Sequence, residues 1–495
     1  MKTRSVARGA VTVAIGGLVS KIIGAAYRLP LTNLIGAEGI GLYQMVFPVY
    51  CALLTFSSTG LPSAISKLVG ENEENADKIF SRSLMLFGTI GMVGSALMLV
   101  LGGFISEIQG NASAGACYRA MSPSVFTVSV ISCVRGYFQG RSDMRPTAVS
   151  QITEQAVKTV FGLTACYFFA YDVKKAATAA ALAVTVSEVA ALIYLLIKLR
   201  ISGYKKQKFA EKPIGFGKIL ALTVPVGLAA FMLPLGHFAD SFIIINVLGR
   251  NGGATELYGI YSGSVAALTG VPVAVAYGAA VACVPAISRG ENSAITDALR
   301  FTGLICIPFT LFFTFFAKEC IDLTYGGMNA LQRFNAAQIL GVDAISVTLL
   351  SFLQTVNAIL VARGKQRLPV YTLAGALIVR AALCAWFCSI SSVGIIGAPA
   401  AANLSLAFAL AINIVHALEN VSLTVVLNDI TKCVVCSLIC VLAGFYVYNA
   451  IGGVVAFVCF SAASAACYVF LTYIFGPLKE TFRVRPGGKK KSVSA

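Results

Sequence analysis

The sequence predicts an all-α polytopic membrane protein, and three features of its composition lead to this prediction. Of the 495 residues, 57% are hydrophobic and only 12% are charged, whereas soluble domains carry about 25% charged residues. The mean hydropathy is +0.82. So few charges cannot cover the water-exposed surface of a folded chain of this length. The composition therefore excludes a soluble enzyme, a disordered protein and a nucleic-acid-binding domain.

The chain contains about fourteen apolar runs that are long enough to cross a bilayer as helices, since a crossing needs about 20 residues. In order, these predicted spans cover 10–32, 42–64, 83–105, 118–138, 147–170, 177–197, 219–248, 257–287, 301–318, 336–361, 369–390, 397–416, 430–449 and 454–475. The predicted organisation is an N-terminal lobe at 1–200, a basic linker at 201–218, a C-terminal lobe at 219–418, two further helices within 419–478, and a basic tail at 479–495.

The placement of the basic residues sets the predicted orientation. The net charge of +17 comes from 38 Lys and Arg against 21 Asp and Glu. If the N-terminus lies in the cytoplasm, most of these cations fall in inside loops, Arg289 and Arg300 among them, or in the two tails. Both termini are therefore predicted to be cytoplasmic. The basic tail is expected to lie near anionic membrane lipids without a specific protein partner.

Cysteine and histidine usage predicts no metal site. The chain has 14 cysteines but only 2 histidines, and most of the cysteines sit inside apolar runs, where they act as small apolar side chains. The sequence also lacks a phosphate-binding loop of the ATPase type. We therefore expect no cofactor, and coupling to the membrane potential or to a monovalent ion instead of to ATP.

The two halves of the chain repeat each other at an offset of six spans. Three pairs of segments match: Pro62–Lys67 with Pro285–Arg289, Gln139–Pro146 with Ala362–Pro369, and Ala179–Ala181 with Ala400–Ala402. An even offset leaves both copies in the same orientation, so the predicted repeat is parallel, with two six-helix lobes and two C-terminal helices. Duplicated lobes are typical of alternating-access transporters, and this favours a monomeric transporter over an enzyme or a receptor.

Two segments carry a family resemblance: Ile40–Gln44 followed by Phe47 and Pro48, and Arg135–Gly140 followed by Pro146 and Gln151. They resemble the polysaccharide-flippase branch of the multidrug/oligosaccharidyl-lipid/polysaccharide exporter superfamily. The resemblance implies two lobes around a central cavity in a bacterial cell membrane. It also implies a flippase that moves an undecaprenyl-pyrophosphate-linked saccharide, or a peptidoglycan precursor such as lipid II, to the outer leaflet. The alternative is a cation-coupled multidrug exporter on the same fold.

The resemblance further implies that cations of the first span bind the pyrophosphate headgroup. Lys21 matches a position where the family commonly has arginine, and Arg28 lies two turns further along the same helix face. Arg135 and Gln151 complete the predicted substrate-binding set. The alternatives are that Arg28 extends to the outer interface, that Lys21 forms an internal ion pair with Glu188, and that Arg135 anchors the end of its helix.

Six other polar residues within the spans are candidates for gating or ion coupling. Their alternative roles are structural: a self-neutralising pair at i and i+4 for the first two, pairing with other charges for Glu188 and Arg380, and hydrogen bonding between helices for His237 and Asp240. The candidates are Glu154, Lys158, Glu188, His237, Asp240 and Arg380.

Overall fold

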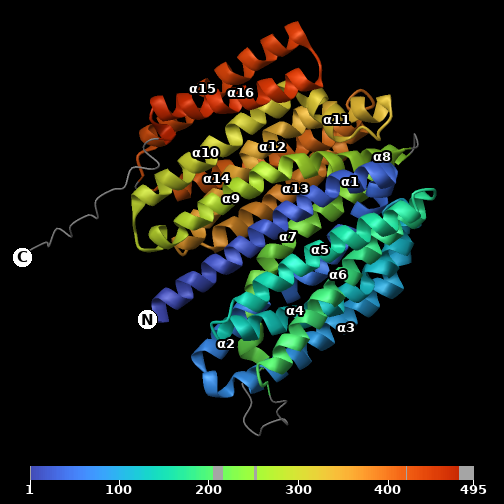
Figure 1. Cartoon of the computed structure of the whole chain (residues 1–495), viewed down its shortest axis with the longest axis vertical. Helices are drawn as coiled ribbons and strands as arrows, with labels where there is room; N and C mark the ends of the chain where they lie inside the picture. Colours follow the sequence, from blue (N-terminus) through green and yellow to red (C-terminus); the bar gives the residue numbers. More distant parts are fainter. Residues whose placement is uncertain (1, 59, 205–215, 250–252, 420, 479–495) are drawn as a thin grey trace, which may run out of the picture. The chain divides into compact units, whose positions relative to one another are not determined.

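The computed structural model describes residues 2–58, 60–204, 216–249, 253–419 and 421–478, which form helices joined by short turns and contain no strand (Figure 1). The predicted all-α membrane fold is therefore confirmed. The predicted tail at 479–495 and most of the predicted linker at 201–218 lie outside the described residues, as do some side chains within helices, including that of Lys21.

In the described part of its first half, the chain forms eight α-helices and three short turns of other helix types. They are α1 (Lys2–Ser58), α2 (Leu61–Glu71), η1 (Glu73–Asn75), α3 (Ala76–Ile108), η2 (Ala112–Ala114), α4 (Gly115–Gly140), α5 (Arg145–Phe168), α6 (Val173–Ile201), α7 (Phe216–Leu248), α8 (Ala254–Gly259) and the π-helical turn η4 (Ile260–Val265).

The second half forms eight further α-helices and one 3₁₀ turn. They are α9 (Ala266–Ser288), α10 (Asn292–Phe315), α11 (Ala317–Thr324), α12 (Ala330–Ala362), α13 (Arg367–Ser389), η5 (Gly394–Ile396), α14 (Gly397–Ala417), α15 (Leu423–Ile451) and α16 (Val454–Ile474). Each of the fourteen predicted spans falls mainly within one or more of these helices.

Gly36 divides α1 into the first and second predicted spans. Its backbone has φ 71° and ψ 175°, a conformation that favours glycine because a Cβ would be strained there. The predicted turn between the first two spans is therefore present at this residue. Beyond the break, the second half of α1 runs to Ser58, and α2 continues the predicted span after residue 60.

Eleven helices in the described part of the chain are long and apolar enough to cross a membrane by length and composition. Neither α4 nor α5 is among them, although the sequence predicts a span in each. Most of α4 is buried within the protein, so polar side chains on it find protein partners in place of lipid. Helix α4 therefore lies in the protein interior, where a lower hydropathy is tolerated, whereas α5 buries only six of its 24 residues.

The chain divides into two compact units. Unit 1 contains residues 1–271, 324–342 and 373–405, and unit 2 contains 272–323, 343–372 and 406–495. Because this division passes through several helices, it does not test the predicted domain boundaries, and the parallel repeat also stays a prediction. Within unit 1, α3 to α6 pack side by side (Figure 1) around a core that includes Phe80 and Tyr137. Within unit 2, α15 packs against α10 and α16.

The structure corrects the assignment of Arg300 to an inside loop. Helix α10 begins at Asn292, nine residues before the predicted start of its span, and the Arg300 side chain is only 1% exposed. Its Nη2 lies 2.6 Å from Oδ2 of Asp429 in α15, and its Nη1 lies 3.0 Å from Oδ1 of Asp297. Two carboxylates compensate the buried positive charge, and this is why the arginine side chain can be buried within the protein.

Candidate functional site

The candidate site lies in unit 1, where α1 packs closely against α5. A Cβ added at Gly16 would lie 2.8 Å from Cβ of Ala148, and one added at Gly24 would lie 3.1 Å from Oε1 of Gln155. Such close approach requires glycine. The backbone of α1 therefore meets the polar face of α5, and Lys21 lies on α1 between these two contacts, with its side chain outside the described part.

Arg28 is a cation without a counter-ion among the described residues. It lies in the span Ala26–Thr55 and is partly exposed. Its guanidinium forms no ion pair and no hydrogen bond with any described residue, although its carbonyl accepts a 2.9 Å hydrogen bond from Thr32 Oγ1. A cation therefore lies in a candidate membrane-spanning helix of unit 1 without an ion-pair partner among the described residues.

Glu154 on α5 pairs with Arg135 of α4. Arg135 Nη2 lies 3.2 Å from Glu154 Oε2, and its Nε donates a 2.9 Å hydrogen bond to Ser150 Oγ. Lys158, one turn beyond Glu154, forms no ion pair with any described carboxylate. Its Nζ lies instead over the ring of Tyr27, 5.8 Å from the centroid. The structure therefore does not contain the self-neutralising pair of Glu154 and Lys158 that was the alternative role for these two residues.

Two other predicted residues in this lobe have unsatisfied acceptor atoms. Oε1 of Gln151 is buried, and no described residue donates to it. Glu188 in α6 is 2% exposed and accepts a hydrogen bond from the hydroxyl of Tyr50, while its Oε2 has no donor in the described part. Both atoms lie on helices that surround α1, so they leave acceptor capacity for a ligand or a proton.

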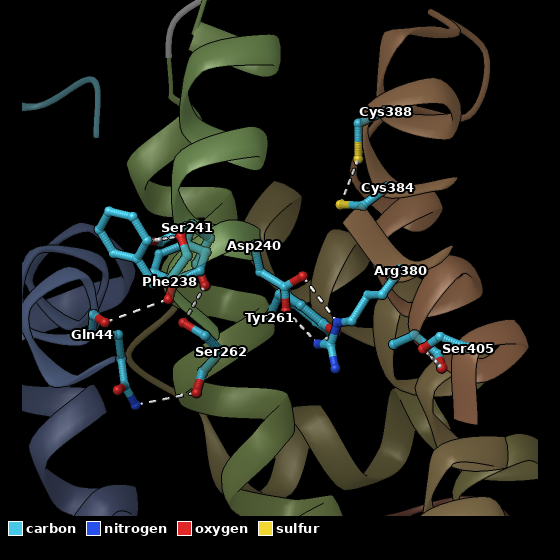
Figure 2. Close-up of polar contacts among 12 residues, drawn as sticks. Gln44, Phe238, Asp240, Ser241, Tyr261, Ser262, Arg380, Cys384, Cys388 and Ser405 are labelled. Carbon is cyan, nitrogen blue, oxygen red and sulfur yellow. Dashed lines mark hydrogen bonds and ion pairs between the residues drawn. The ribbon is translucent and has the colours of Figure 1, made fainter. Parts of the chain in front are cut away.

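A second polar cluster joins α7, η4 and α13, also within unit 1. Figure 2 shows the Arg380 side chain reaching from α13 to Asp240 of α7, with its Nε 3.0 Å from Oδ1 in a two-point ion pair. Arg380 Nη2 also lies 3.3 Å from the hydroxyl of Tyr261. Asp240 therefore already has a cation partner. His237, one turn earlier in α7, is exposed.

Polar side chains close the end of unit 1 that lies opposite the predicted cytoplasmic side. Gln109 Nε2 donates to Ser241 Oγ at 2.8 Å, and Asn111 Nδ2 donates to Thr255 Oγ1 at 2.9 Å. Gln44 Nε2 of α1 donates to the carbonyl of Ser262 in η4 at 3.1 Å (Figure 2). These bonds join the first-lobe helices α1 and α3 to the segment from α7 to η4.

A cavity of about 270 Å³ lies at this closed end, and Glu38, Asn111, Thr255 and Glu256 are among its lining residues. Its two carboxylates make it unsuitable for an anion. Arg28 and Lys158, which form no ion pair with any described residue, lie elsewhere in unit 1, on α1 and α5, so an anion-binding site is to be sought there.

The sequence profile of the family described as polysaccharide biosynthesis protein matches residues 6–291. The chain belongs to this family. Among relatives, stage V sporulation protein B of Bacillus subtilis (strain 168) is 27% identical over 356 residues, which is 67% of this chain and 68% of that protein. Lipid II flippase MurJ of the same organism is 24% identical over 419 residues, or 76% of each chain.

Solved structures give the fold of this polysaccharide biosynthesis family member. A lipid II flippase MurJ structure in an inward closed conformation has a TM-score of 0.75 at 14% identity, covering 94% of this chain and 98% of that one. An inward-facing multidrug resistance MATE family transporter of the MOP superfamily has a TM-score of 0.69 at 17% identity, covering 84% and 98%. The family resemblance stated from the sequence is therefore confirmed.

The predicted site residues of this family member fall into two groups in unit 1. The first lies on α1, α4, α5 and α6 and includes Arg28, Arg135 and Glu188, and the second contains Asp240 and Arg380. The roles assigned to these residues stay predictions. Sequence reasoning missed the aromatic hydroxyl groups of Tyr50 and Tyr261, because a tyrosine in an apolar run gives no signal of which charge it will meet.

Proposed function

We propose that this protein is a flippase that moves a polyprenyl-diphosphate-linked saccharide or peptidoglycan precursor from the inner to the outer leaflet of a bacterial cell membrane. The observation that carries the proposal is Arg28, a membrane-embedded cation without a counter-ion among the described residues. Such a charge costs at least about 2.5–3.5 kcal/mol to insert, so it needs a function or a ligand. The name of one relative, lipid II flippase MurJ, supports the same substrate class.

The mechanism proposed is alternating access. The diphosphate headgroup enters from the cytoplasmic side and is neutralised by Arg28 and Lys21, while the polyprenyl tail stays in the lipid. The hydrogen bonds of Gln109 and Asn111 then break, so that the opposite end opens. The membrane potential or a monovalent ion gradient returns the protein to its first state.

We also propose that the protein acts as a monomer, with both termini in the cytoplasm and its basic tail on anionic lipids.

The alternative, a cation-coupled multidrug exporter, needs a carboxylate that is open to a cation. Two of the candidate carboxylates are engaged by arginines, Asp240 by Arg380 and Glu154 by Arg135. Glu188 accepts a hydrogen bond from Tyr50 with one oxygen, and its Oε2 has no donor among the described residues. Because two of the three carboxylates are paired with arginines, these contacts favour a site for an anion over a site for a cation.

A leaflet-accessibility assay tests the proposal. The purified protein is placed in liposomes that contain a fluorescent polyprenyl-diphosphate saccharide, and movement between the leaflets is followed by quenching. We expect Arg28→Ala with Lys21→Ala to slow flipping about tenfold or more, because charge-assisted hydrogen bonds contribute about 1.5–3 kcal/mol each. Arg119→Ala is the matched control, since Arg119 is an exposed arginine at the beginning of α4. Flipping by the double variant at the wild-type rate would contradict the proposal.

A further inference from the structure

Unit 1 contains a second cation, within the predicted span 147–170, that forms no ion pair with a described residue. Lys158 lies on α5, partly buried, and it forms neither an ion pair nor a hydrogen bond with a described side chain. Its ammonium group lies over the ring of Tyr27 in α1, 5.8 Å from the ring centroid. Tyr27 directly precedes Arg28, so the ammonium group of α5 lies beside the turn of α1 that carries Arg28.

Neither Glu154 nor Glu188 forms an ion pair with Lys158. Glu154 is four residues earlier on the same helix face, where an i, i+4 pair would normally form, yet its carboxylate lies 3.2 Å from Arg135. Glu188 accepts a hydrogen bond from Tyr50 with one oxygen, and its Oε2 has no donor among the described residues.

Two cations that form no ion pair with a described residue repel each other in a low-dielectric region, and each is more costly there than a charge in direct contact with an anion. A ligand with two negative charges on adjacent groups removes both penalties at once. A diphosphate diester has this form, with one negative charge on each phosphate. A monophosphate ester places its charge on a single group, so it cannot contact both cations equally well.

We propose that Lys158 and Arg28 together bind the diphosphate group, and that Arg135 is a positioning residue that holds Glu154 away from Lys158. The inference rests on the proposed function and assigns contacts within its site. It gives Lys158 a binding role in place of the gating role predicted from the sequence. It also replaces the direct substrate contact predicted for Arg135 with an indirect action through Glu154.

The test measures binding by the full-length protein in lipid nanodiscs, with undecaprenyl diphosphate as the probe. Lys158→Met is expected to raise the Kd about tenfold or more, since it removes one charge-assisted contact, whereas Lys158→Arg should change it by less than about threefold. Thermal unfolding of each variant shows that it is folded. Equal affinity of folded Lys158→Met and wild type would overturn the inference while leaving the proposed function intact.

A second set of variants tests the role of Arg135. Arg135→Gln frees Glu154 to neutralise Lys158 and should weaken binding about tenfold, and Arg135→Gln with Glu154→Gln should restore it. In a Lys158→Met protein, Arg135→Gln should have no further effect. A merely structural ion pair would give the same loss with or without Lys158, and that result would overturn the positioning role.

Two other probes separate the possible sources of the diphosphate. Inorganic pyrophosphate should compete with the lipid, and its affinity should also fall in Lys158→Met. Undecaprenyl monophosphate should bind more weakly and respond less to that substitution. If only pyrophosphate bound the wild type, the diphosphate site would stand and the proposed lipid substrate would fail. If the monophosphate and diphosphate lipids lost the same affinity, the two-cation site would be wrong.

Discussion

At the scale of single residues, buried charges are explained by partners that are distant in sequence. Arg300 and Asp429 are 129 residues apart, yet their side chains lie 2.6 Å from each other inside unit 2. The sequence shows each charge but not the fold that joins them. This is why Arg300 was predicted in a loop, and why Asp240 and Arg380 were both identified as candidates without being recognised as a pair.

Removing Arg300 should be strongly destabilising. Arg300→Ala leaves two carboxylates, those of Asp429 and Asp297, without their guanidinium, and breaking a buried pair costs about 3–5 kcal/mol. We expect a clear fall in the thermal unfolding temperature in detergent. Arg289→Ala is the control, because its pair with Glu291 is exposed and contributes at most about 1 kcal/mol. The same small shift for both variants would show that the buried pair does not stabilise unit 2.

At the scale of helices, most of the architecture could be predicted from the sequence. Long apolar runs show directly where the helices lie. The break at Gly36 could be expected because Gly36 and Gly39 lie close together between the first two predicted spans. Helix ends were harder to place, as the early start of α10 shows, because a charged residue ends an apolar run even when a partner buries it. The sequence shows the polar residues along α5, but it does not show which of their charges pair with α4.

Helix α3 provides a matched test of packing between helices. A Cβ at Gly91 would lie 2.4 Å from Ser129 Oγ and 3.2 Å from the Cα of Phe126, both in α4, whereas one at Gly88 would meet nothing within 4 Å. Gly91→Ala should therefore cost about 1–3 kcal/mol through overpacking. Gly88→Ala should be neutral or slightly stabilising, since alanine favours a helix by about 0.5–1 kcal/mol. Unfolding in detergent measures both, and equal effects would contradict close packing of α3 on α4.

At the scale of the whole molecule, the family and fold followed from the sequence, while the closed end of unit 1 did not. Its hydrogen bonds join segments more than 100 residues apart, such as Gln109 with Ser241 and Asn111 with Thr255. Asparagine and glutamine at helix ends are common in any protein, so sequence alone cannot distinguish those that close a pathway. The proposed transport cycle nevertheless depends on these contacts, because substrate release requires that they separate.

Locking this end should stop transport. Asn111 and Thr255 make a side-chain contact of 2.9 Å, so a short thiol-reactive cross-linker should join the double variant Asn111→Cys, Thr255→Cys once the exposed cysteines Cys459 and Cys467 are replaced by serine. In the liposome assay, we expect cross-linking with a reducible reagent to abolish flipping and reduction to restore it. Each single-cysteine variant should be unaffected by the reagent. A fully cross-linked protein that still flips its substrate would rule out opening at this end, since alternating access requires both ends to open in turn.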